Sequence, residues 1–218
     1  MTARRLHQGG RFRTWLGAHL GGDPELGDRA WRRILHCLGA GILIYYLFPP
    51  NVLIIVPNYV ILLLALVAVI LIETLRLGGV LELPTMRPYE QHRIASYAYF
   101  ALALVLAVLL FPPPIAAAVV LGTAFIDPLI GELRRASQYP HAYPWIPLAL
   151  YTTFATVAFI GVGNWAPLPA LSLAVLAAVL ALLVERPQWV LVDDDLAMTL
   201  VPAVVLYGIV LVARGFVH

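Results

Sequence analysis

Long blocks without charge dominate this sequence and restrict what it can fold into. Residues 34–72 contain no Asp, Glu or Arg, and Asp127 is the one such residue in the blocks 94–111, 115–130, 136–184 and 196–213. The hydrocarbon core of a bilayer is about 30 Å thick, and roughly 20 apolar residues of α-helix cross it. Only 12% of all residues are charged, whereas soluble domains have about 25%. The sequence therefore predicts an all-α integral membrane protein.

Proline- and glycine-rich segments divide these blocks into about seven transmembrane helices. Residues 49–51 (PPN) split the first block, and residues 161–169 (GVGNWAPLP) split the block 136–184. Residues 1–30 are basic and lack the continuous apolar core of a signal peptide, so we expect them to form an amphipathic segment on the membrane surface. Residues 31–218 would then form the polytopic membrane domain.

Positive charge alternates from one predicted loop to the next. Arginines occur in the N-terminal segment and after the second, fourth and sixth predicted spans, whereas the loops FPPN, FPPPI and GVGNWAPLP carry no charge. By the positive-inside rule, the N-terminus is cytoplasmic and the C-terminus lies outside. The acidic residues follow the arginines, which predicts a polar chemistry at the cytoplasmic interface. In a prokaryote the membrane would be the plasma membrane.

The cations are all of one kind. The chain has 14 arginines and no lysine, and its net charge is +2. This small net charge gives no reason to expect a nucleic-acid partner. Guanidinium groups are planar and permanently charged, and they bind phosphate or carboxylate in a bidentate manner.

Three consecutive acids, Asp193, Asp194 and Asp195, precede the last apolar block. A helix N-terminus favours an anion, and Asp is a good N-cap. Capping explains one or two of these residues but not three adjacent like charges. Carboxylate oxygens together with nucleotide phosphates are the usual ligands of Mg²⁺. We therefore favour a metal site in which one or two of the three are ligands.

Asp127 lies inside a predicted span, in the segment LGTAFIDPLIGELRR. A carboxylate there is costly, so by default it is a candidate functional residue. Gly122 and Gly131 flank it and allow close approach of a ligand or a neighbouring helix. Arg134 and Arg135 follow and could hold phosphate oxygens. The alternative is a helix that ends near Asp127, with the two arginines as ordinary membrane anchors.

Two further segments combine acids with arginines. Glu73 with Arg76, and Glu90 with Arg93, are spaced i,i+3. Taken alone, such a pair is a weakly stabilising feature of a helix end, but two pairs in one loop could also hold a shared site together.

Arg32 and Arg33 precede the first span, and His36 lies one turn inside it. A single histidine near an interface is more often a packing residue than a base, although its arginine neighbours favour a functional role.

Together these segments resemble the dolichol kinase and phytol kinase group. The matching features, in chain order, are Arg32-Arg33-x-x-His36, Glu73-x-x-Arg76, the segment RPYE at 87–90, a helix with Gly122, Asp127 and Gly131, then Glu185, and Asp193–Asp195 before LAMTLVP. Two features depart from that group. Thr123 stands where its first helix Asp would follow the glycine, and its Lys-Ser-x-Glu-Gly segment is missing.

The resemblance implies a CTP-dependent kinase of a polyprenol-type isoprenoid alcohol, with Mg²⁺ as the cofactor and the active site cytoplasmic. Its implied catalytic residues are Asp127 and Asp194. The metal ligands would come from Asp127, Asp193, Asp194 and Asp195. The implied nucleotide-binding residues are Arg32, Arg33, His36, Arg87, Arg134, Arg135 and Glu185, and Glu73, Arg76, Glu90 and Arg93 would support the site.

Two other functions are compatible with the sequence. A cytidylyltransferase that forms a CDP-lipid would use similar Asp-rich helix starts but a lipid phosphate as its substrate. A non-catalytic lipid-binding protein derived from the kinase group would explain the missing Lys segment. A homodimer is compatible with each of these functions.

Overall fold

The computed structural model describes residues 24–52, 56–81, 83, 86, 90–135, 141–185 and 193–215. Arg87 and most of the basic N-terminal segment lie outside this part of the chain. The regular elements among the described residues are helices, apart from an antiparallel pair of two-residue strands, β1 (Asn51–Val52) and β2 (Val56–Pro57). The helices are α2 (Pro24–Leu38), the 3-10 helix η1 (Gly39–Leu47), α3 (Tyr59–Leu77), α4 (Ser96–Leu110), α5 (Pro113–Arg135), α6 (Trp145–Gly161), α7 (Pro167–Glu185) and α8 (Asp194–Gly215).

The predicted helical class is confirmed, and the apolar helices support the predicted membrane character. Within the described residues, α3, α5, α7 and α8 are long and apolar enough to cross a membrane. Helices α4 and α6 are equally apolar but have 15 and 17 residues. The segment expected as the first span is not a single α-helix, because α2 ends at Leu38 and η1 continues the chain. Helix α2 also passes residue 30 without a break, where the membrane domain was expected to begin.

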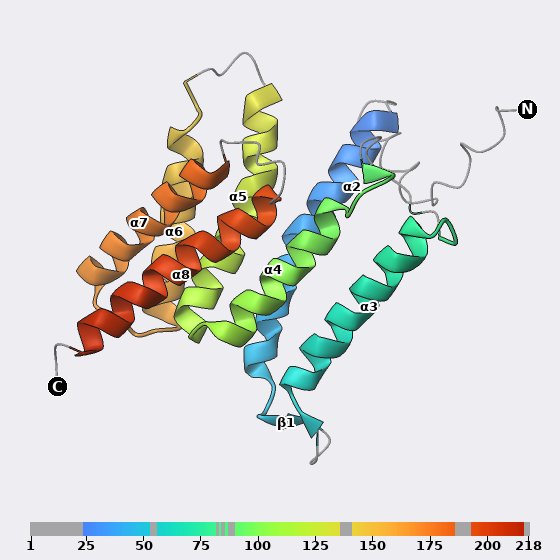
Figure 1. Cartoon of the computed structure of the whole chain (residues 1–218). Helices are drawn as coiled ribbons and strands as arrows, with labels where there is room; N and C mark the ends of the chain where they lie inside the picture. The colour runs from blue at the N-terminus through green and yellow to red at the C-terminus, as the bar shows by residue number, and fades with distance from the viewer. Residues whose placement is uncertain are drawn as a thin grey trace, which may run out of the picture.

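Helix α5 is the centre of the bundle. It contacts α2, η1, α4, α6, α7 and α8, and most of the buried residues in its first half are alanine or valine. Small side chains allow membrane helices to approach closely. The tightest example is Gly122, which lies against the ring of Tyr151 on α6, so that a Cβ at this position would overlap the ring. Helix α3, in contrast, packs mainly on α4 and leaves most of its apolar surface exposed (Figure 1).

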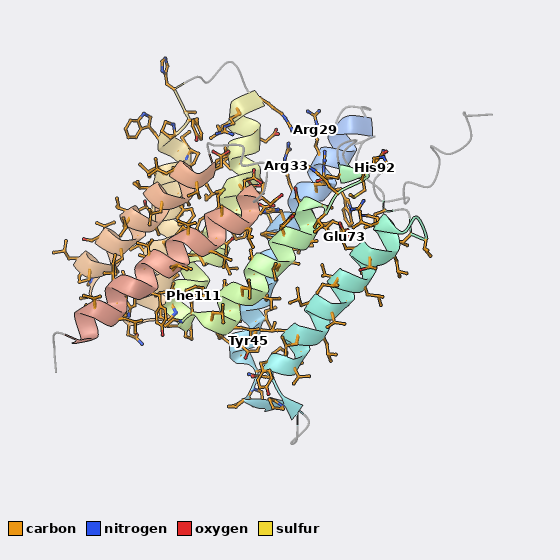
Figure 2. All side chains as sticks on the ribbon, viewed as in Figure 1. Arg29, Arg33, Tyr45, Glu73, His92 and Phe111 are labelled. Atoms are coloured by element: carbon orange, nitrogen blue, oxygen red, sulfur yellow. The ribbon has the colours of Figure 1, made fainter. Side chains whose placement is uncertain are left out.

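The helices alternate in direction, so the charged helix ends meet at one end of the bundle. Figure 2 shows Arg29, Arg33 and Glu73 at this end, and Tyr45 and Phe111 at the opposite end. The first group comes from α2 and α3, which run in opposite directions (Figure 1). We call this end the charged end.

Candidate functional site

A cavity of about 590 Å³ opens at the charged end. Helices α2, α4, α5, α7 and α8 contribute to its wall, together with Leu83 and Met86 from the segment between α3 and α4. Its charged lining residues are Arg29, Arg32, Arg33, Arg134 and Arg135, and the acids Glu90, Asp127, Glu185, Asp194 and Asp195. The sequence analysis assigned six arginines of the described residues to phosphates or to the site. Four of them line the cavity, namely Arg32, Arg33, Arg134 and Arg135, whereas Arg76 and Arg93 do not.

Three side chains from three helices meet in this cavity. His36 Nε2 of α2 lies 3.3 Å from Asp195 Oδ1 of α8 and 3.8 Å from Asp127 Oδ2 of α5. One ligand atom from each residue lies within 4.8 Å of the others. The His36 ring is stacked on Phe100 of α4, with ring centroids 3.8 Å apart. The structure thus joins Asp127 to the acidic triplet, 68 residues further along the chain at Asp195, as a shared ion would require.

The three consecutive acids have different environments. Asp193 precedes α8 and caps it: its Oδ1 accepts a hydrogen bond from Asp195 N at 3.2 Å, and its Oδ2 accepts one from Ser96 Oγ at 3.0 Å. Asp194 is exposed at the first helical position. Asp195 is buried, with 5% of its surface exposed, and belongs to the cluster with His36 and Asp127. Capping therefore accounts for Asp193, whereas Asp194 and Asp195 both line the cavity and Asp195 is the buried one.

Asp127 does not lie at a helix end. Helix α5 continues for eight residues beyond it, to Arg135, so the alternative of a helix ending near Asp127 is wrong. Pro128 is tolerated inside the helix, although its ring removes one backbone donor and leaves the carbonyl of Ala124 without its usual partner. Asp127 lines the cavity together with Gly131, one turn further on, where a Cβ would meet no atom within 4 Å.

Thr123, which replaces an expected Asp, has a structural partner. It is fully buried one turn before Asp127, and its hydroxyl oxygen lies 3.0 Å from that of Thr199 on α8. Thr199 also donates to the carbonyl of Asp195 at 2.8 Å. This hydroxyl pair holds α5 and α8 together directly beside the cluster.

Glu185 binds Arg134 rather than facing the cavity alone. Two guanidinium nitrogens of Arg134 lie 2.6 Å from the two carboxylate oxygens, and Tyr143 donates a hydrogen bond to Glu185 at 3.1 Å. Arg134 also covers the Tyr143 ring, 4.9 Å from its centroid. Arg33 of α2 pairs with Glu132 of α5. Both contacts hold arginines in position around the opening.

Glu73 and Arg76 form a buried clamp outside the cavity. Their side chains are 7% and 5% exposed, so the interpretation as a weak helix-end pair is wrong. Arg76 donates to both oxygens of Glu73, at 2.8 and 2.6 Å, and to the carbonyls of Glu90 and Arg93, at 2.9 and 2.7 Å. The clamp thereby fixes the segment that leads into α4.

The clamp also reaches residues that the sequence analysis missed. Glu73 accepts hydrogen bonds from Ala95 N at 2.7 Å and from the Tyr97 hydroxyl at 2.5 Å. Tyr97 lines the cavity, and the intervening Ser96 binds Asp193. The segment SYAYF resembles the start of any apolar span, so no signal in the sequence pointed to Ser96 or Tyr97.

Comparison with known proteins identifies no relative: no protein-family model, curated protein or solved structure matches this chain. The resemblance to the dolichol and phytol kinase group therefore depends on the short motifs alone and stays an expectation. The cavity geometry provides a separate basis for considering function.

Proposed function

We propose that this protein is a membrane-embedded lipid kinase that transfers a phosphoryl group from a nucleotide, with CTP favoured, to a polyprenol-type isoprenoid alcohol. The observation that carries this proposal is the cluster of His36, Asp127 and Asp195 in a cavity surrounded by arginines. Phosphoryl transfer depends mainly on positioning and on neutralising the phosphate charge. A carboxylate site for a cation beside several guanidinium groups meets both requirements.

The cluster fits a divalent cation. Asp127 and Asp195 place carboxylate oxygens within 4.8 Å of each other, and Mg²⁺ is commonly held by one or two carboxylates plus substrate phosphates and water. A bound Mg²⁺ would neutralise charge on the transferred phosphoryl group. In this proposal Arg32, Arg33 and Arg135 bind the nucleotide phosphates.

The substrate alcohol would enter from the apolar part of the same cavity. Leu35, Leu83, Met86 and Phe100 line it beside the charged residues, so an isoprenoid chain can remain among apolar groups while its hydroxyl reaches the acids. Asp194, exposed on the same wall, is the candidate to accept the proton of that hydroxyl.

The proposal places the charged end in the cytoplasm and the C-terminus outside, with seven crossings. Helices α2 and η1 would form one crossing, since their 15 and 9 residues together rise about 40 Å. The concentration of arginines at the charged end supports this orientation through the positive-inside rule. In a prokaryote the protein would lie in the plasma membrane.

The test is a transfer assay with the full chain purified into lipid nanodiscs. Polyprenols and each common nucleoside triphosphate are supplied with Mg²⁺, and both lipid and nucleotide products are identified. The proposal predicts a polyprenyl phosphate and a nucleoside diphosphate. Asp127→Asn and Asp195→Asn should each abolish the product, whereas Ser172→Ala, on the exposed face of α7, should leave the rate unchanged.

The same assay separates the other functions. Release of pyrophosphate and formation of a CDP-lipid from a lipid phosphate would indicate a cytidylyltransferase. Saturable polyprenol binding without nucleotide binding or product would indicate a non-catalytic lipid binder. Either result would refute the kinase proposal.

A further inference from the structure

The cluster in the cavity contains a nitrogen donor as well as oxygen donors. His36 comes from α2, whereas Asp127 and Asp195 come from α5 and α8. The atom that faces the two carboxylates is Nε2. Mg²⁺ sites are built from oxygen ligands, so a site of pure Mg²⁺ type gives no reason for an imidazole at this position.

The contacts of His36 have the geometry of a shared ligand set. Its Nε2 atom is buried and has no hydrogen-bond partner within the described part of the chain, although Asp195 Oδ1 is only 3.3 Å away. The distance between Nε2 and Oδ1 suits a hydrogen bond, but the angle between the two groups does not. Two ligands of one ion can lie this close without a hydrogen bond between them, because each ligand atom is directed at the ion. Ligands at about 2.1 Å from an ion in octahedral geometry lie about 3 Å apart.

The His36 ring is also held in place. It is stacked on Phe100 with an angle of 18° between the ring planes. A packing histidine would be explained by this stacking alone, but stacking does not explain why Nε2 is directed between two carboxylates. A fixed imidazole that faces two carboxylates is a preorganised donor set, which reduces the cost of assembling a metal site.

We infer that His36 is a metal ligand, and that the cation of this site is a first-row transition-metal ion held by one imidazole and two carboxylates, in preference to Mg²⁺. Imidazole favours transition metals over Mg²⁺, and carboxylates accept either class. Mn²⁺ suits this set best as a probe, because it combines the oxygen preference of Mg²⁺ with tolerance of nitrogen. The inference rests on the proposed function in taking the cavity as a metal-dependent site.

The experiment measures metal binding directly, without substrate. The full chain in nanodiscs, with any affinity tag removed, is titrated with Mn²⁺ and followed by electron paramagnetic resonance, with Mg²⁺ as the competitor. We expect one Mn²⁺ per chain, with an affinity at least about tenfold above that of Mg²⁺, and a ¹⁴N hyperfine coupling from the imidazole. His36→Asn should lower Mn²⁺ affinity about tenfold or more, since even outer partners of metal ligands contribute 10–100-fold, and should remove the ¹⁴N coupling.

Two matched variants complete the design. His92→Asn changes an exposed histidine that does not line the cavity, and should preserve both affinity and coupling. Asp195→Asn should weaken Mn²⁺ and Mg²⁺ alike. His36→Gln provides a second substitution, and each variant is checked for monodisperse size-exclusion behaviour before titration.

The inference is overturned if the wild-type chain binds no Mn²⁺, if the bound Mn²⁺ shows no ¹⁴N coupling, or if a folded His36→Asn protein retains the affinity and coupling. Its outcome is separate from that of the kinase proposal. Coupled Mn²⁺ without polyprenol phosphorylation would support the metal site and refute the kinase. Polyprenol phosphorylation by a protein whose bound Mn²⁺ shows no ¹⁴N coupling would support the kinase and refute His36 as a metal ligand.

Discussion

The Glu73–Arg76 clamp allows a sharp test of how burial changes the value of an ion pair. In Glu73→Ala, the Arg76 guanidinium loses both of its carboxylate contacts and keeps its hydrogen bonds to the carbonyls of Glu90 and Arg93. Ala95 N and the Tyr97 hydroxyl also lose their acceptor. Removing one partner of a buried pair costs about 3–5 kcal/mol, because a buried charge is left without compensation. We expect a loss of stability in this range.

The chain contains a matched control. Glu132 and Arg135, at the end of α5, have the same i,i+3 spacing as Glu73 and Arg76, but they are 47% and 52% exposed and their closest atoms are 3.5 Å apart. An exposed helical pair contributes about 0.3–0.5 kcal/mol. Arg135→Ala should therefore cost no more than about 0.5 kcal/mol. The two substitutions compare one sequence pattern in two environments.

The assay is equilibrium unfolding in mixed micelles with increasing sodium dodecyl sulfate, followed by far-ultraviolet circular dichroism. A third protein, Glu73→Leu with Arg76→Met, removes both charges and should be more stable than Glu73→Ala, because no charge is left buried. The reasoning is refuted if Glu73→Ala and Arg135→Ala differ by less than about 1 kcal/mol, or if the double variant is the least stable of the three.

Two further predictions concern the contacts of α5. Gly122→Ala should destabilise the protein by about 1–3 kcal/mol through overpacking, because the new Cβ would overlap the Tyr151 ring. The control is Gly208→Ala, where a Cβ meets no atom within 4 Å; it should be neutral or slightly stabilising in the same unfolding assay. Thr199→Val should cost about 1–2 kcal/mol because it leaves the buried Thr123 hydroxyl without its partner, and Thr199→Ser should remain close to wild type; equal stability of the valine and serine variants would contradict this prediction.

Much of the architecture could be read from the sequence because it depends on local composition. A charge-free apolar block can satisfy its backbone groups in a membrane only as a helix, and proline-rich interruptions show where the helices end. The helices α3, α5, α7 and α8 follow directly from this rule. The first predicted span was less accurate, since nothing in its composition separates a continuous α-helix from α2 followed by η1.

The acidic residues could also be identified as candidates from the sequence, because a carboxylate beside or within an apolar span is energetically costly and by default indicates a function. Their separate environments were not identifiable. Asp193, Asp194 and Asp195 are chemically the same and adjacent, and only the rotation of α8 decides that the first caps the helix, the second is exposed and the third points at His36.

The sequence by itself determined the helical membrane class, the gathering of charge on alternate loops and the candidate acids, because these properties depend on residue type and local spacing. Only the tertiary structure decided which of them meet. Glu73–Arg76 and Glu132–Arg135 have the same spacing, yet one pair is buried by the segment before α4 and the other is open to its surroundings. Burial is a property of the elements packed around a pair, and those elements come from distant parts of the chain.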